Sequence, residues 1–215
     1  MQMVTRRVLF TGAGAAVASG AAFSGMSVVS PGWAQQPSPP IRIRGRIEKV
    51  DGNALIIISR DGAALNVRLA DNARLTALVP ASLSDIKPNS YIGVTAVPQA
   101  DGTQKAIAIH IFPESMRGTG EGFRPWDKAP GSTMTNAAVD TTVAGVDGQV
   151  MMLKYKGGEK KVVVPPGTPI VTYAPASRDE VKPGAQIIIL GAQKQPDGSL
   201  TAPSMNIGRG IAPPM

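Results

Sequence analysis

The feature that most constrains the fold is a set of turn residues that recurs about 96 positions later in the chain. Val50-Asp51-Gly52 recurs as Val146-Asp147-Gly148, and Asp101-Gly102 recurs as Asp197-Gly198. Aspartate–glycine pairs mark tight turns because glycine adopts positive φ angles without strain. Matches at turns indicate that one short β-rich unit occurs twice, and they say little about activity.

Each unit has the pattern of a small β-barrel. Ile41-Arg-Ile-Arg-Gly-Arg-Ile47 places isoleucines on one face and arginines on the other, as a half-buried strand requires. Ser82 to Asp85 fits a capping box around one short helical turn, and Ser177 to Glu180 repeats it. Three strands, a short helix and two strands is the order of an OB-type barrel. The sequence therefore predicts an all-β fold of two tandem, five-stranded OB-like barrels, at residues 41–112 and 139–208, each with a short helical turn.

The only histidine of the chain, His110, ends the last strand of the first unit. Ile107, Ile109 and Ile111 share one face of that strand, so His110 is predicted to point the other way, outward from an edge strand. A histidine in such a position is more often solvated than a ligand, although histidine is the usual side chain for metal or proton work.

Composition excludes several classes of site. The chain has no cysteine, which excludes a disulfide framework, a thiolate nucleophile and a cysteine-ligated zinc site. One histidine excludes a multi-histidine metal centre within one chain, and a Ser-His-Asp triad would have to use His110. The sequence contains no phosphate-binding loop and no nucleophile elbow. We therefore expect neither an enzyme nor a cofactor.

Residues 1–34 resemble a twin-arginine export signal. Thr5-Arg6-Arg7-Val8-Leu9 precedes a mildly apolar segment rich in Ala, Gly, Val and Ser, and Pro31 to Ala34 supplies small residues for a signal peptidase. An uncleaved membrane anchor is the alternative, although glycine and alanine make a poor membrane span. We expect a periplasmic protein, with cleavage after Ala34.

The net charge is +7, and without Arg6 and Arg7 the remaining 20 basic and 15 acidic residues leave +5. A basic surface suits nucleic acid, anionic lipid, or an acidic partner or glycan. Export makes nucleic acid the least expected of these, and we expect contact with a membrane only through an uncleaved leader.

A connector at residues 113–138 joins the units and has no counterpart after the second one. Three of the six aromatic residues outside the leader lie in it or next to it, so it is predicted to be ordered rather than a flexible tether. Glu114 is three positions from Arg117, and Arg124 is three positions from Asp127, so each can form an ion pair. One interpretation of these charges is that they only hold the two units together.

The other interpretation is a binding site, because loops held on rigid scaffolds concentrate binding residues. Arg117 and Arg124 can grip a carboxylate or phosphate, with Trp126 as a stacking wall. Alternatively, the histidine and the acidic residues can hold a divalent cation such as Mn or Zn, although no defined ligand spacing supports this. The candidate binding residues are His110, Glu114, Arg117, Glu121, Arg124, Trp126 and Asp127.

The pattern Gly-x-Ile-x-x-Val-Asp-Gly, then alternating strands, Ser-Leu-x-Asp-Ile-Lys-Pro, Ala-Asp-Gly and an Ile-rich strand resembles a widespread exported bacterial domain of unknown function. That domain is described as OB-like and often occurs in tandem. The connector phrase from Phe-Pro-Glu to Arg-Pro-Trp-Asp resembles a subset of these proteins in alphaproteobacteria, which carries a histidine where this chain has Phe123. The resemblance implies a fold and a compartment, without a mechanism, and the missing histidine weakens a metal site.

We therefore expect a non-enzymatic periplasmic binding or assembly protein that engages a periplasmic or envelope protein at the connector. The alternative is an accessory of a transport system that binds a divalent metal or a small anion. Residues 209–215 are expected to form a loose tail.

Overall fold

The structure is a computed structural model that describes residues 40–145 and 148–214. The expected leader, residues 1–34, lies outside the described residues, as does the Val146-Asp147 part of the repeated turn. The described chain is mostly β-strand, as predicted. Its helical residues form the short 3-10 turns η1 Leu83–Asp85, η2 Glu114–Met116 and η3 Arg178–Glu180. None of the helices in the described part is long and apolar enough to cross a membrane.

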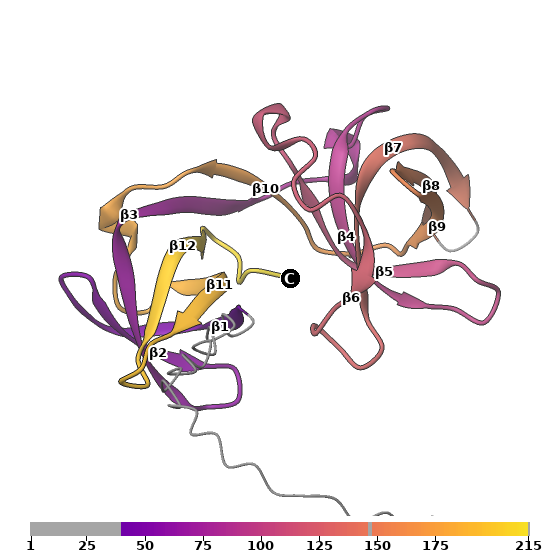
Figure 1. The fold of residues 1–215 in the computed structure, drawn as a ribbon. Helices are drawn as coiled ribbons and strands as arrows, with labels where there is room; N and C mark the ends of the chain where they lie inside the picture. The colour runs from indigo at the N-terminus through magenta and orange to yellow at the C-terminus, as the bar shows by residue number, and fades with distance from the viewer. Residues whose placement is uncertain (1–39, 146–147, 215) are drawn as a thin grey trace, which may run out of the picture. The chain divides into compact units, whose positions relative to one another are not determined.

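The described residues form twelve strands that pair in one continuous network (Figure 1). Their bounds are β1 Ile41–Asp51, β2 Ala54–Ser59, β3 Ala64–Pro80, β4 Tyr91–Pro98, β5 Gln104–Ile111, β6 Gly122–Pro125, β7 Thr133–Gly145, β8 Gly148–Tyr155, β9 Gly158–Val164, β10 Ile170–Pro175, β11 Gln186–Lys194 and β12 Leu200–Gly208. The order of β1 to β5 recurs in β7 to β12, with β9 and β10 in place of the single long strand β3. Pro165 and Pro166 separate β9 from β10, because proline has no N–H to donate to a ladder.

Five strands close into a barrel, called here the β1 barrel: β1, β2, β3, β12 and β11. The parallel pairing of β12 with β3, from Leu200–Val67 to Gly208–Leu78, closes it. The predicted alternation in β1 is confirmed, since Ile43 and Ile47 are buried in the interior while the arginines between them lie outside the core. Apolar residues from all five strands fill this interior.

Strands β4, β5, β7, β8 and β9 form a second closed set of pairings, called here the β7 ring. Strand β9 returns to β5 through Gln104–Val162 and Lys105–Val163. The interior holds a separate apolar cluster that includes Ile92, Val94 and Leu153. Strand β10 connects the two sets, since it pairs antiparallel with the end of β3 and parallel with β5.

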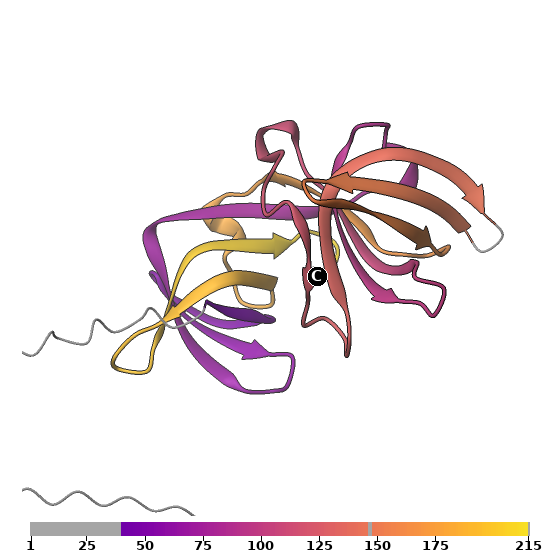
Figure 2. The same cartoon turned by 45° about the vertical axis from the view of Figure 1, so that its right-hand side comes forward.

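The pairing exchanges the last two strands between the halves of the chain. Strands β11 and β12 complete the β1 barrel, whereas β4 and β5 belong to the β7 ring. The expected division into contiguous units at 41–112 and 139–208 therefore does not describe the strand pairing. The physical reason is β3, which at 17 residues runs beyond the β1 barrel and carries the chain to the β7 ring (Figures 1 and 2).

The connector and the tail are both held in place. Strand β6 pairs with the start of β7, from Gly122–Asn136 to Pro125–Thr133, so the second half begins at residue 133 rather than 139. The tail expected to be loose is anchored at its first residue, Arg209. The Arg209 N–H donates to the Leu78 carbonyl at 2.9 Å, and the Arg209 guanidinium donates to Glu180 at 2.7 Å.

Candidate functional site

A cavity of about 220 Å³ lies where strands of the β1 barrel meet strands of the β7 ring and the connector. Strands β3, β11 and β12 contribute one part of its lining, and β5, β7 and β10 contribute another. The side chains most relevant to its chemistry are His110, Phe112, Arg124, Trp126, Asn136 and Tyr173. Because both halves of the chain line it, the cavity depends on the strand exchange.

His110 is only 1% exposed, so its predicted outward position is wrong. Its strand β5 is no edge strand, since it lies between β4 and β10. The ring Nδ1 lies 3.2 Å from the Gly93 carbonyl, and because a carbonyl only accepts, Nδ1 carries the proton and Nε2 is a free acceptor. Burial lowers the pKa of His110 to about 3, against the raising effect of the Gly93 carbonyl, and Lys128 lowers it further. The imidazole is therefore neutral near pH 7.

Three buried polar side-chain atoms around this cavity have no hydrogen-bond partner within the described part of the chain: His110 Nε2, Trp126 Nε1 and Asn136 Oδ1. The Asn136 amide is oriented by its Nδ2, which donates to the Thr119 carbonyl at 2.9 Å. Buried polar groups nearly always have a partner, and leaving one unpaired costs about 1–3 kcal/mol. Three such atoms on residues around one space make this cavity a candidate binding site.

Gly93 lies beside one of these atoms, Asn136 Oδ1, and beside Nδ1 of the His110 ring. It pairs with His110 on β5 and with Asn136 on β7, so the three residues form one row across the ring. A Cβ atom at position 93 would lie 2.8 Å from Asn136 Oδ1, 3.1 Å from the Phe112 ring and 3.2 Å from His110 Nδ1. A larger residue at position 93 would therefore have to displace the Asn136 amide or the rings beside it.

The electrostatic environment of the cavity is positive. Arg74 and Arg124 line it, and no acidic side chain of the described residues does. Arg124 donates to the Gly120 carbonyl at 2.7 Å and lies 5.5 Å from the centre of the Trp126 ring. Arg42 lies over the same ring at 4.0 Å. Burial, and then the charge of Arg42, lower the pKa of Arg124.

Four of the seven candidate residues lie outside this lining. Glu114 and Arg117 form the predicted ion pair, with one hydrogen bond of 2.7 Å, and Arg117 also donates to the Asn89 carbonyl at 2.9 Å. Glu121 accepts a hydrogen bond of 2.7 Å from the backbone N–H of Lys156. These contacts tie the connector to the β7 ring and its flanking turns.

Asp127 binds β1 instead of the expected Arg124. Its carboxylate accepts hydrogen bonds of 2.7 and 3.2 Å from Arg44 and lies 3.6 Å from Arg42. The hydrogen bond from Arg44 is the main cause of a lowered pKa at Asp127. Arg124 is held away from this pair by its contacts with Gly120 and Trp126.

The divalent-metal hypothesis gains no support from this arrangement. In the described ranges, no three His, Cys, Asp or Glu side chains come close enough together to hold a metal ion. His110 is buried, whereas Glu114 and Asp127 are engaged with arginines.

Asp127→Asn is expected to lower the free energy of unfolding by about 1 kcal/mol, because the bidentate pair with Arg44 is lost and the carboxylate is nearly half exposed. Urea denaturation measures the difference. Asp140→Asn removes the more exposed pair with Lys154 and is expected to cost only a few tenths of a kcal/mol. Equal losses in both variants would contradict a structural role for Asp127.

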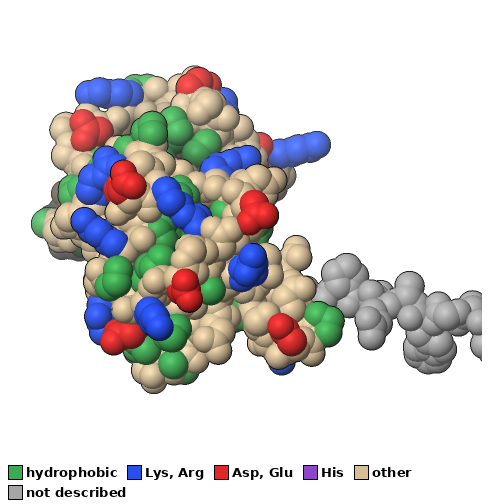
Figure 3. All heavy atoms as spheres, turned by 90° about the vertical axis from the view of Figure 1, so that its left-hand side faces the viewer, with side chains coloured by type: hydrophobic (Ala, Val, Ile, Leu, Met, Phe, Trp, Pro, Cys, Tyr) green, Lys and Arg blue, Asp and Glu red, His purple; other side chains and the backbone are tan. Residues whose placement is uncertain are grey.

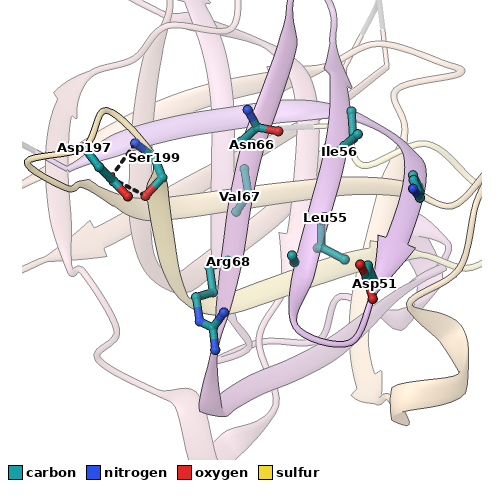
Figure 4. Close-up of a pocket in the computed structure, with 10 residues that line it drawn as sticks. Asp51, Leu55, Ile56, Asn66, Val67, Arg68, Asp197 and Ser199 are labelled. Atoms are coloured by element: carbon teal, nitrogen blue, oxygen red, sulfur yellow. Dashed lines mark hydrogen bonds between the residues drawn. The ribbon is translucent and has the colours of Figure 1, made fainter.

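A larger, open depression of about 410 Å³ lies on β1, β2 and β3 beside the turn between β11 and β12 (Figure 4). Asn66, Arg68 and Asp197 in its lining are exposed, and Asp197 accepts hydrogen bonds from Ser199. No aromatic side chain of the described residues lines it. On the face drawn in Figure 3, basic and acidic side chains are interspersed, so charge marks no docking patch there. The cavity lined by His110, Trp126 and Asn136 is therefore the stronger candidate site.

No protein-family model matches the chain, and comparisons with curated proteins and with solved structures also give no match. The site is therefore interpreted from its own geometry. Three candidate residues from the sequence, His110, Arg124 and Trp126, line the cavity. Sequence reasoning missed Gly93 and Asn136, and the available signal was a glycine inside an apolar strand, which marks a close approach or an open space.

Proposed function

We propose that this chain is a non-enzymatic binding protein that holds a small polar solute in the cavity. The observation that carries the proposal is the set of three buried, unpartnered atoms, His110 Nε2, Trp126 Nε1 and Asn136 Oδ1, around one space of about 220 Å³. One water molecule takes about 30 Å³ of the liquid, so the space suits several waters or one small organic molecule. A histidine with a pKa of about 3 is a weak base, which favours binding over acid–base catalysis.

We also propose that the protein consists of two OB-like barrels and is exported to the periplasm. The order of three strands, one helical turn and two strands, and the closure of both sets of pairings, support two OB-like barrels that exchange their last two strands. The twin-arginine pattern of residues 1–34 supports export to the periplasm. The resemblance to exported tandem OB-like domains is consistent with both.

The contacts of the connector favour a solute over a protein partner at that segment. Glu114, Arg117 and Asp127 form ion pairs within the chain, and Glu121 binds the Lys156 backbone. The arginines at the cavity favour an anionic solute, which agrees with the alternative of an anion-binding accessory in transport.

Thermal melting with a panel of organic acids, amides and amino acids is expected to give a saturable stabilisation. A solute at about 100 times its Kd adds about 2.7 kcal/mol, and each kcal/mol raises the Tm by roughly 2–4 °C for a chain of this size. Trp126→Phe keeps an aromatic ring but removes the Nε1 donor, so it is expected to abolish most of the shift. Tyr155→Phe, which removes a hydroxyl outside the cavity lining, is the matched control and is expected to keep it. Absence of a shift with every solute class would contradict the proposal.

A further inference from the structure

Two of the three unpartnered atoms are hydrogen-bond acceptors on residues that line the same cavity. Nε2 of His110 is an acceptor because Nδ1 carries the proton, and Oδ1 of Asn136 is an acceptor by its chemistry. A Cβ at Gly93 would lie within 3.2 Å of both the Asn136 oxygen and the His110 ring. A hydrogen-bond donor within the cavity therefore satisfies groups that the protein leaves unpaired.

The charges around the cavity favour an uncharged donor over an ammonium group. Arg74 and Arg124 line the cavity, and Lys128 lies close enough to lower the pKa of His110. No acidic side chain of the described residues lines the cavity to compensate a bound cation. A further positive charge in this partly buried place is therefore repelled. An amide N–H or a hydroxyl donates without that cost.

The Trp126 indole and the Arg124 guanidinium at the cavity are hydrogen-bond donors. Trp126 Nε1 is a donor without a partner, and guanidinium groups bind carboxylates with paired, charge-assisted hydrogen bonds. Arg124 lies next to Asn136, since a Cβ at Gly120 would lie 3.2 Å from Asn136 Nδ2 and 3.3 Å from Arg124 Nη2. Acceptor and donor groups of the protein thus lie side by side within one small space.

We propose that the cavity selects a small organic anion that also carries an uncharged N–H or O–H donor. The donor binds His110 Nε2 or Asn136 Oδ1, and the carboxylate is directed toward Trp126 and Arg124. This inference rests on the proposed function, because it requires that a solute occupies the cavity. An acid without the donor group leaves the two acceptors unpaired and is expected to bind about 10- to 100-fold more weakly.

The single histidine gives a direct test on the whole protein. In protein labelled with ¹⁵N in the imidazole ring, the free form is expected to show one protonated nitrogen, Nδ1, and one unprotonated nitrogen, Nε2, at neutral pH. The protein is titrated with matched triplets of probes: lactate, propionate and 2-propanol, then 4-hydroxybenzoate, benzoate and phenol. In at least one triplet, the hydroxy acid is expected to shift the Nε2 resonance toward its hydrogen-bonded range and to bind tightest.

Each of the following results contradicts one part of this inference. A free protein whose Nε2 is protonated overturns the acceptor assignment. Parent acids that bind as tightly as the hydroxy acids overturn the role of the two acceptors. Arg124→Gln is expected to weaken the hydroxy acid about tenfold while the Nε2 shift persists at saturation, and unchanged affinity overturns the placement of the carboxylate. If no probe moves Nε2 while other solutes raise the Tm, only this inference fails. If no solute moves Nε2 and none raises the Tm, both this inference and the proposed function fail.

Discussion

Two fragments obtained by dividing the chain between Pro130 and Gly131 are each expected to be unfolded alone and to fold together when mixed. The N-terminal fragment, from residue 35, supplies β1, β2 and β3 to the β1 barrel but β4 and β5 to the β7 ring. The C-terminal fragment supplies the complementary strands. The division falls in the loop between β6 and β7, so no strand is interrupted.

The expected effect is large because each fragment leaves both sets of pairings open. Without β11 and β12, the β1 barrel loses core residues such as Ile187, Ile189 and Met205, and the edges of β1 and β3 are exposed. Open sheets of two or three strands with half a core are marginal in water. Each fragment also risks aggregation through its unpaired edges.

Folding is measured by circular dichroism and amide NMR. Spectra are recorded for each fragment, for their equimolar mixture and for the intact chain from residue 35. The mixture is expected to reproduce the spectrum and the cooperative melting of the intact chain. Contiguous barrels at 41–112 and 139–208 would instead let each fragment fold independently, and that result would contradict the exchanged pairing.

The sequence was sufficient for local structure because local structure depends on local chemistry. Gly52, Gly102 and Gly198 have positive φ angles of 56°, 82° and 84°, as turn glycines require. Alternation in β1 likewise identified the buried isoleucines, since a strand with one face in a core has a period of two. These features belong to each strand or turn by itself.

The same local reasoning could not predict which strands pair with each other. The two halves have similar turns and similar apolar patterns, so β1 and β3 are chemically suited to the last two strands of either half. What decides the pairing is the path of β3, whose end pairs with β10 instead of turning back. That path depends on contacts between residues about 95 positions apart, such as Leu78 and Tyr173, which no local pattern contains.

The candidate site was predicted in part for a related reason. Arg124 and Trp126 were identified because their chemistry is rare in this chain, whereas Asn136 and Gly93 matter only because β4 places them in one row with His110. Alternation correctly put His110 on the face opposite Ile109. It does not reveal that this second face is also covered, here by Phe112 and Tyr173, whose ring centres each lie 6.5 Å from the imidazole.

The free energy of unfolding is expected to fall as the pH is lowered from about 6.5, before most carboxylates titrate. Burial lowers the pKa of His110 from 6.5 to about 3, so between these values the unfolded chain binds a proton that the folded chain does not. The stabilising neutral form is fully populated in both states above pH 6.5, and stability is lost as the pH falls toward 3. The expected slope is about 1.4 kcal/mol per pH unit, or about 2–3 kcal/mol between pH 6.5 and about 4.5.

Urea denaturation across this pH range measures the slope, and His110→Phe is expected to remove most of it while filling a similar volume. Carboxylates with lowered pKa values, such as Glu114 and Asp127, contribute at lower pH and are common to both proteins. A slope that persists in His110→Phe, or an imidazole that gains its second proton near pH 6 in the ¹⁵N spectrum, would show that water reaches the ring. Because Nε2 accepts a hydrogen bond only while it is unprotonated, a buried and neutral His110 also requires solute affinity to stay nearly constant down to about pH 4.5.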